Sequence, residues 1–278
     1  MADDGLFEEP AFEVPDAPAA STLVDTGEIG PTGRPLPVFP PPQPPREGPR
    51  RAVIVSMCNQ KGGVGKTTTT LALGRGLAMR GHRVLLVDLD PHASLTRAFG
   101  VATDPQPAGV LDLFDEQPPA LATLARATEI ENLSFIAAQT PLATLERRSA
   151  TQPGLGLALS NALARGGHAW DFVLFDCPPT LGLLMVNALA AADILLVPLG
   201  ATFLEFDSTG RFFDMLYSTF ASVEEGENAA RRRNGLPEMR FEWDAVRALI
   251  TRFDASQQTD LANVIQAYFG DFMTTYRQ

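Results

Sequence analysis

Lysine is almost absent from this chain. Of its 22 basic residues only two, Lys61 and Lys66, are lysines, and all others are arginines. Both lysines lie in one glycine-rich segment. A compact ammonium fits between phosphate groups where a planar guanidinium does not. The retention of lysine at these two positions therefore indicates a phosphate-binding loop.

Other absences narrow the class of protein. A net charge of −11 argues against a protein that coats nucleic acid with its whole surface. No apolar run approaches the roughly 18 residues needed to span a bilayer, and the acidic start lacks the basic region of a signal peptide. The two cysteines, Cys58 and Cys177, lie in or beside apolar runs, so we expect buried, reduced thiols rather than a zinc site. These features favour a cytoplasmic protein.

The first 50 residues differ in composition from the rest. They hold 12 of the 23 prolines, with nine acids against three arginines. The stretch Pro35–Pro49 is typical of an extended, polyproline-like segment. Burial in such a segment cannot offset the entropy lost on ordering, so we predict a disordered tail at 1–50. This tail would be a tether, a partner-docking segment or a passive tail. Residues 51–278 would form one domain.

From residue 51 onward, predicted strands and helices alternate. Apolar runs predict strands at 52–57, 83–87, 133–137, 172–175, 194–197 and 245–250. Helical spacing predicts helices at 67–80, 155–165, 181–190, 203–222 and 257–269. The polar stretch 224–240 is expected to be a surface loop. This alternation predicts an α/β fold with a doubly wound, mostly parallel sheet, whose ligands bind at the carboxyl ends of the strands.

The segment from Asn59 to Thr68 follows a predicted strand and opens a predicted helix, as a P-loop does. Its glycines would let backbone N–H groups converge on phosphate oxygens at the positive end of the helix dipole. A lysine here reaches the β- and γ-phosphates, and the next hydroxyl ligates Mg²⁺. The predicted nucleotide-binding residues are Gly62, Gly63, Val64, Gly65, Lys66, Thr67 and Thr68. Gln60 stands where the common motif begins with glycine.

Three carboxylates follow predicted strands. Asp88 and Asp90 end the second strand, where alternate positions point the same way, and Asp176 ends the fourth. The carboxyl ends of parallel strands share one sheet edge, so these acids are expected beside the P-loop. An apolar strand that ends in aspartate is the Walker-B arrangement, which orients Mg²⁺ or its water.

Together the segments KGGVGKTT, DLDPHASLT and DCPPTLGLLMVNALAAAD resemble the ParA/MinD family of deviant Walker-A ATPases, in particular the ParA branch, over residues 52–269. The resemblance implies a P-loop NTPase fold that binds ATP and Mg²⁺. ATP would close a sandwich homodimer and slow hydrolysis would open it. Lys61 would match the signature lysine, which reaches across the interface to the partner's nucleotide. Since Lys66 already serves the phosphates in cis, a second cation acting across an interface would couple hydrolysis to dimerisation.

The resemblance also implies roles for the remaining residues. Lys66 would be the ordinary P-loop lysine, Thr67 the Mg²⁺ ligand and Thr68 a phosphate contact. Asp90 would activate the hydrolytic water. Asp88 and Asp176 would be outer-shell acids of the metal site.

The function that this resemblance implies is the partition of a plasmid or chromosome region, or the positioning of a protein cargo. The implied partner is a ParB-like protein or a cargo adaptor. The family's closing strand and helix, which help hold adenine and carry a DNA-contacting arginine, are not evident. Members of the ParA branch often carry arginine soon after the corresponding Phe-Asp, but here Phe253–Asp254 is followed by Ala255, Ser256 and Gln257. This counts against non-specific DNA binding and nucleoid association, although Arg231–Arg233 could supply another basic patch. No basic amphipathic helix closes the chain, so we expect no membrane attachment.

Two other functions share the fold. A small-molecule phosphoryl-transfer enzyme would need a polar substrate cluster, which the sequence does not reveal. A GTP-dependent switch would commonly need a third lysine for guanine recognition, and the chain has none. ATP is therefore the expected nucleotide.

Overall fold

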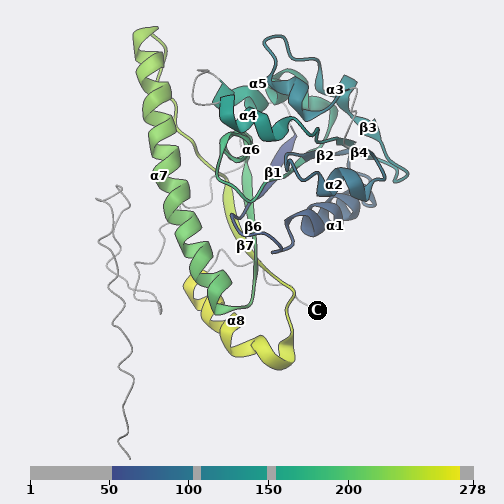
Figure 1. Ribbon diagram of the computed structural model, residues 1–278, viewed down its shortest axis with the longest axis vertical. Helices are drawn as coiled ribbons and strands as arrows, with labels where there is room; N and C mark the ends of the chain where they lie inside the picture. The colour runs from purple at the N-terminus through teal and green to yellow at the C-terminus, as the bar shows by residue number, and fades with distance from the viewer. Residues whose placement is uncertain (1–51, 103–107, 149–154, 270–278) are drawn as a thin grey trace, which may run out of the picture.

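The computed structural model describes residues 52–102, 108–148 and 155–269, which form one α/β unit (Figure 1). The predicted tail at 1–50 lies outside these residues. The sheet has the strand order β3-β4-β2-β5-β1-β6-β7, and only the β3–β4 pair is antiparallel. The strands are β1 (Val53–Met57), β2 (Val84–Asp88), β3 (Arg126–Ala127), β4 (Leu133–Ile136), β5 (Phe172–Asp176), β6 (Ile194–Gly200) and β7 (Ala245–Thr251). The prediction of a mostly parallel sheet is confirmed, and only the two-residue β3 was not foreseen.

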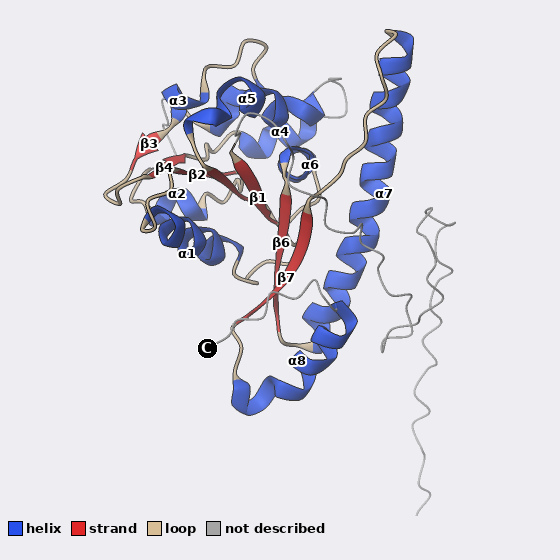
Figure 2. Ribbon diagram, turned by 180° about the vertical axis from the view of Figure 1, so that it is seen from behind, coloured by secondary structure: helices blue, strands red, loops and turns tan. Residues whose placement is uncertain are grey.

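Helices cover both faces of this sheet (Figure 2). In that view α1 and α2 lie on one side, and α4, α5 and α6 on the other. The helices are α1 (Lys66–Ala78), α2 (Ser94–Ala98), α3 (Leu121–Leu124), α4 (Leu142–Arg148), α5 (Ala158–Gly166), α6 (Leu183–Ala191), α7 (Phe203–Arg233) and α8 (Ala255–Phe269). Short 3₁₀ helices occupy Val110–Phe114, Leu155–Leu157 and Gly167–Ala169.

Strand β1 shows why the strands are apolar at most positions. Val55 and Met57 belong to the core cluster on the α1 side, whereas Ile54 and Cys58 belong to the larger cluster on the opposite face. Because successive side chains point to opposite faces, a strand covered by helices on both sides needs apolar residues on both faces, and its one buried serine, Ser56, donates to the Ala188 carbonyl at 2.8 Å. The polar residues that follow such a strand mark where it ends.

The prediction of a surface loop at 224–240 is wrong in its first half, because α7 continues to Arg233. Tertiary contacts hold the polar end of this helix. The Asn228 side chain donates to the Met239 carbonyl at 2.9 Å and accepts from the Met239 amide at 2.8 Å. The segment around Met239 therefore satisfies the hydrogen-bonding groups of Asn228, whose place in a helix cannot be predicted from periodicity alone.

Both cysteines are fully buried, free thiols directly after β1 and β5, as predicted. Burial raises the pKa of the Cys58 thiol to about 12. Within the part of the chain that the structure describes, no helix is both long enough and apolar enough to cross a membrane.

Candidate functional site

The glycine-rich loop connects the central strand β1 to α1. Gly63 and Gly65 have φ angles of 75° and 93°. These angles lie in the left-handed region, which residues with a side chain rarely adopt. Between them, Val64 is fully buried and anchors the loop to the core. Its carbonyl oxygen accepts a 2.7 Å hydrogen bond from the Thr251 hydroxyl at the end of β7. Two strands of the sheet thus fix the shape of this loop.

Lys66 begins α1 and is largely buried. Its ammonium donates to the Lys61 carbonyl, also in the loop, at 3.0 Å. Burial lowers the pKa of Lys66, while the neighbouring Cys177, Asp176 and Asp90 oppose this shift. An anion bound in the loop would favour the charged form of this desolvated lysine.

Lys61 is held through its backbone rather than its side chain. Its amide donates to the Asn59 side-chain oxygen at 3.0 Å. Asn59 is fully buried and donates in turn to the Pro198 carbonyl of β6 at 2.9 Å. Among the residues that the structure describes, the Lys61 ammonium has no hydrogen bond or ion pair. The Lys66 ammonium is therefore bonded within the loop, whereas the Lys61 ammonium can reach a ligand.

Asp176 and Thr67 make the second part of the site. The Thr67 hydroxyl donates to Asp176 Oδ2 at 2.7 Å. The other carboxylate oxygen, Oδ1, is buried without a partner among the described residues. Burial raises the pKa of Asp176 to about 7. A nearby divalent cation would stabilise the charged form, and a water of its shell would donate to the unpaired oxygen, so this pair fits a magnesium ion.

Asp88 lies opposite Asp176 in the β2–β5 ladder, so the predicted meeting of these acids at one sheet edge is observed. Asp88 Oδ2 accepts from both the amide and the hydroxyl of Thr96 at 2.7 Å. Burial raises the pKa of Asp88 to about 6. Thr96 was not predicted as a site residue, although it lies in the quoted DLDPHASLT segment.

Asp90 is the half-buried acid of the site. Its amide donates to Asp88 Oδ1 at 3.2 Å, and its own Oδ1 accepts from the His92 amide at 2.9 Å. The backbone turn from Asp90 to His92 therefore orients this carboxylate, with one oxygen still free of any hydrogen bond in the described part of the chain.

No group of three or more histidine, cysteine, aspartate or glutamate side chains within the described ranges could hold a metal ion alone.

Another pair, which the sequence did not indicate, lies where β6 and β7 end. Arg252 Nη2 contacts Glu205 Oε1 at 2.6 Å, and Glu205 is buried at the start of α7. Its Oε2 is buried without a partner among the described residues. The two residues are distant in sequence and fit no motif, so only the fold reveals the contact.

Two arginines at the end of α7 are already engaged. Arg232 pairs with Glu225 at 2.9 Å and with Glu238 at 2.7 Å. The Arg231 side chain donates to the Pro237 carbonyl at 2.7 Å. These contacts weaken the case for Arg231–Arg233 as a free basic patch.

The sheet order, the loop after its central strand and the acids beside it define a P-loop nucleoside triphosphatase fold. Residues 52–228 match the family model described as an AAA domain. Chromosome partitioning protein ParA of Myxococcus xanthus is 32% identical over 219 residues, covering 78% of this chain and 71% of that protein. The chain belongs to the ParA/MinD family of P-loop ATPases.

Two further relatives extend this comparison. An uncharacterized protein of Mycobacterium tuberculosis is 33% identical over 274 residues, covering 97% of this chain and 79% of that protein. The crystal structure of cobyrinic acid a,c-diamide synthase from Mycobacterium smegmatis, with bound ATP analogue and magnesium, aligns with a TM-score of 0.61 and 29% identity, covering 78% of each chain.

Proposed function

We propose that this chain is a dimerising switch ATPase of the ParA type, which acts in plasmid or chromosome partition or positions a protein cargo. The observation that carries the proposal is the second lysine of the loop. Lys66 is already bonded within the loop, whereas the Lys61 ammonium is engaged by no described residue. A deviant Walker-A loop of this kind supplies Lys61 to the nucleotide of a partner subunit.

In this proposal the loop binds MgATP. Backbone N–H groups from Gly62 to Gly65 point at the phosphates, and Lys66 lies against the β- and γ-phosphates. Thr68, exposed on the first turn of α1, adds a phosphate contact. Mg²⁺, when bound, neutralises charge that develops on the β- and γ-phosphate oxygens. Thr67 would ligate it directly, with Asp176 and Asp88 in its outer shell.

Asp90 would act on the hydrolytic water. Its carboxylate orients the water and takes a proton from it as the water oxygen bonds to the γ-phosphorus and the bond to ADP breaks. Lys61 from the partner subunit would stabilise the negative charge on the transferred phosphoryl group. Hydrolysis would then occur only in the homodimer, and loss of the γ-phosphate would reopen it.

A cytoplasmic ParB-like protein or cargo adaptor is the expected activating partner. Arg231 and Arg232 are engaged within the protein, which counts against non-specific DNA binding and nucleoid association. The likeness to cobyrinic acid a,c-diamide synthase favours one alternative, a small-molecule phosphoryl-transfer enzyme on the same fold.

The experiment that tests the switch is light-scattering chromatography with ATP and Mg²⁺. Asp90→Ala is expected to slow hydrolysis and accumulate a dimer, and the added change Lys61→Ala is expected to return that dimer to monomer. ADP in place of ATP gives the matched control, with a monomer expected. A monomer in every sample, with nucleotide bound, would reject the switch and favour the phosphoryl-transfer alternative.

A further inference from the structure

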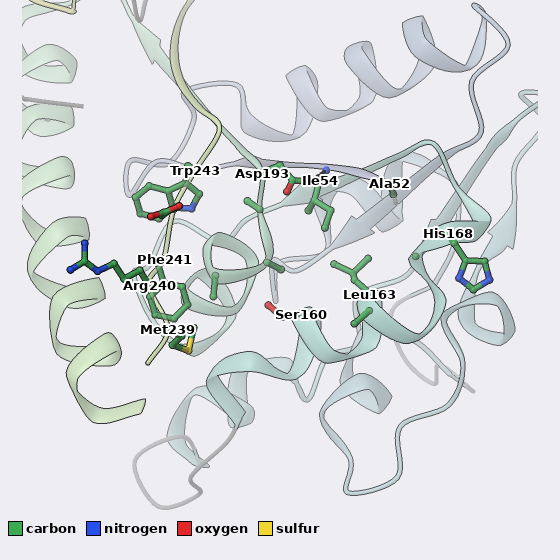
Figure 3. A pocket seen from close by; sticks show the side chains of 16 residues that line it. Ala52, Ile54, Ser160, Leu163, His168, Asp193, Met239, Arg240, Phe241 and Trp243 are labelled. Atoms are coloured by element: carbon green, nitrogen blue, oxygen red, sulfur yellow. Dashed lines mark hydrogen bonds between the residues drawn. The ribbon is translucent and has the colours of Figure 1, made fainter. Parts of the chain in front are cut away.

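Figure 3 shows a pocket, whose volume is about 470 Å³, and it lies at the end of the sheet opposite the P-loop. Its lining includes Ala52, Asp193 and Trp243, which precede β1, β6 and β7. Since these strands are parallel and the P-loop follows the carboxyl end of β1, the pocket is separate from the nucleotide site. Its volume falls in the range of about 300–1,000 Å³ that ligand sites occupy.

The pocket lining is mixed, and its aromatic side is fixed in place. Met239, Phe241 and Trp243 line one side, and Leu163 of α5 lines another (Figure 3). The Trp243 indole N–H donates to the Leu189 carbonyl at 2.8 Å, which orients the ring. Phe220 of α7 packs edge-on against the rings of both Phe241 and Trp243, at centroid distances of 5.0 and 5.2 Å. The aromatic wall is therefore preformed.

One polar group of the pocket is unsatisfied. The Ser160 hydroxyl on α5 is buried and has no hydrogen-bond partner among the described residues. A buried hydroxyl without a partner costs free energy, so a ligand carbonyl that accepts its hydrogen would be favoured. The ligand that fits best is apolar but carries exposed carbonyl groups.

We propose that this pocket binds the proline-rich segment Pro35–Pro49 of the same chain. Ala52 lines the pocket, and the segment ends at Pro49, only three residues before it. A short tether gives an effective concentration of the order of millimolar. Polyproline segments have no internal hydrogen bonds, which leaves their carbonyls free for a donor such as Ser160, and they dock on aromatic-lined grooves. Phe39 is the aromatic residue of this segment.

Charge on the two sides is compatible with this docking. Asp193, Arg240 and Glu242 lie among the pocket residues, and the segment carries Arg46 and Glu47 near its end. The pocket therefore has two acids against one arginine, whereas the segment has one charge of each sign and is not repelled as a whole. A strongly acidic ligand would be disfavoured by this arrangement.

Photo-cross-linking in the full-length protein tests the proposal. A benzophenone amino acid replaces Phe39, and the cross-linked sites are mapped by mass spectrometry after irradiation. We expect the main products to lie on pocket residues, Met239 and Leu163 above all, within single chains. The same probe at Phe7, outside the proline-rich segment, serves as the control and should not favour the pocket.

A matched pair of variants checks that the pocket itself is responsible. Ala164 and Asn161 are both exposed positions of α5, but only Ala164 lines the pocket. Ala164→Arg is expected to reduce the pocket products several-fold, and Asn161→Arg to leave them unchanged, with folding verified by circular dichroism. Products spread over other surfaces, products unaffected by Ala164→Arg, or products that join two chains would each overturn intramolecular docking. The last result would instead indicate a second copy as the occupant.

Discussion

The hydroxyl of Thr251, at the end of β7, donates a 2.7 Å hydrogen bond to the carbonyl oxygen of Val64 in the middle of the P-loop. The same hydroxyl also lies 3.2 Å from the Leu199 carbonyl of β6. The strand most distant from β1 on this side of the sheet therefore helps to hold the loop in shape.

Thr251→Val is expected to weaken nucleotide binding several-fold and to lower the free energy of unfolding by about 1 kcal/mol, the usual net value of one such hydrogen bond. Titration with a fluorescent ATP analogue and urea denaturation measure the two effects. Thr144→Val is the control, because Thr144 is exposed and its hydroxyl bonds only to the nearby Pro141 carbonyl. Equal effects from both changes would mean that the Thr251 contact does not shape the loop.

The Glu205–Arg252 pair should contribute to stability more than an exposed pair does. Arg252→Ala leaves the buried Glu205 carboxylate uncompensated, and we expect a loss of about 1–3 kcal/mol, less than for a fully buried pair because the Arg252 side chain is 58% exposed. Arg211→Ala, which breaks a more exposed pair with the half-buried Asp207 on the same helix, should cost about 0.5 kcal/mol or less. Chemical denaturation measures both. If Arg252→Ala costs no more than Arg211→Ala, the pair is only a surface contact.

Two glycines of α1 should respond oppositely to alanine. A Cβ at Gly74 would lie 2.6 Å from Leu86 Cδ2 in the core, so Gly74→Ala is expected to cost about 1–3 kcal/mol through overpacking. A Cβ at Gly76 would approach nothing closer than 3.5 Å. Gly76→Ala should therefore stabilise the helix by about 0.5–1 kcal/mol. Melting temperatures of the two variants give the comparison, and a stabilising Gly74→Ala would show that Leu86 can move aside.

Asp171 should make stability depend on pH at the acid end. Hydrogen bonds from the Arg83 side chain and amide, together with its charge, lower the pKa of Asp171 to about 2 in the folded protein. A depressed pKa favours folding above the ordinary aspartate pKa of about 4, and this contribution is lost as the pH falls toward 2.

Asp171→Asn is thus expected to lower Tm at pH 7 by at most about 3 °C, since the pair is exposed and screened by salt. The difference from the unmodified protein should shrink as the pH falls from about 4 toward 2. Calorimetry over this range measures it. Arg83→Ala is the companion variant and should reduce the effect of Asp171→Asn without removing it, because the Arg83 amide still donates to Asp171. A difference that stays constant with pH would contradict the ion pair.

Local patterns in the sequence predicted most of the fold and part of the candidate site. The six main strands were predictable because each is apolar at most positions, with single exceptions such as Ser56 and Arg247, and most end at a polar residue or a glycine. Asp88 and Asp176 could be placed at one edge because parallel strands end together, and the β2–β5 register confirms it.

What the sequence could not predict depends on contacts between distant segments. The last turns of α7 are polar, and their helical state rests on Asn228 with Met239 and on Glu224, whose carboxylate accepts from the Phe241 amide. Thr96 and Thr251 likewise have no motif of their own, and they matter because the fold brings them to Asp88 and Val64. The roles of Lys61 and Asp90 remain predictions, since they concern a bound nucleotide and a second subunit.

The position of β1 also constrains how the protein can be made. This strand is synthesised early, but it lies between β5 and β6, and the Ile54 amide bonds to an Asp193 carboxylate 139 residues later in the chain. Contacts so distant in sequence form late, because the intervening chain must first be present. On the ribosome, the P-loop would thus emerge long before the strands that hold it. Nascent chains arrested before Asp193 are expected to retain no ATP analogue, so the ability to bind nucleotide would mark the near-completion of the folded unit.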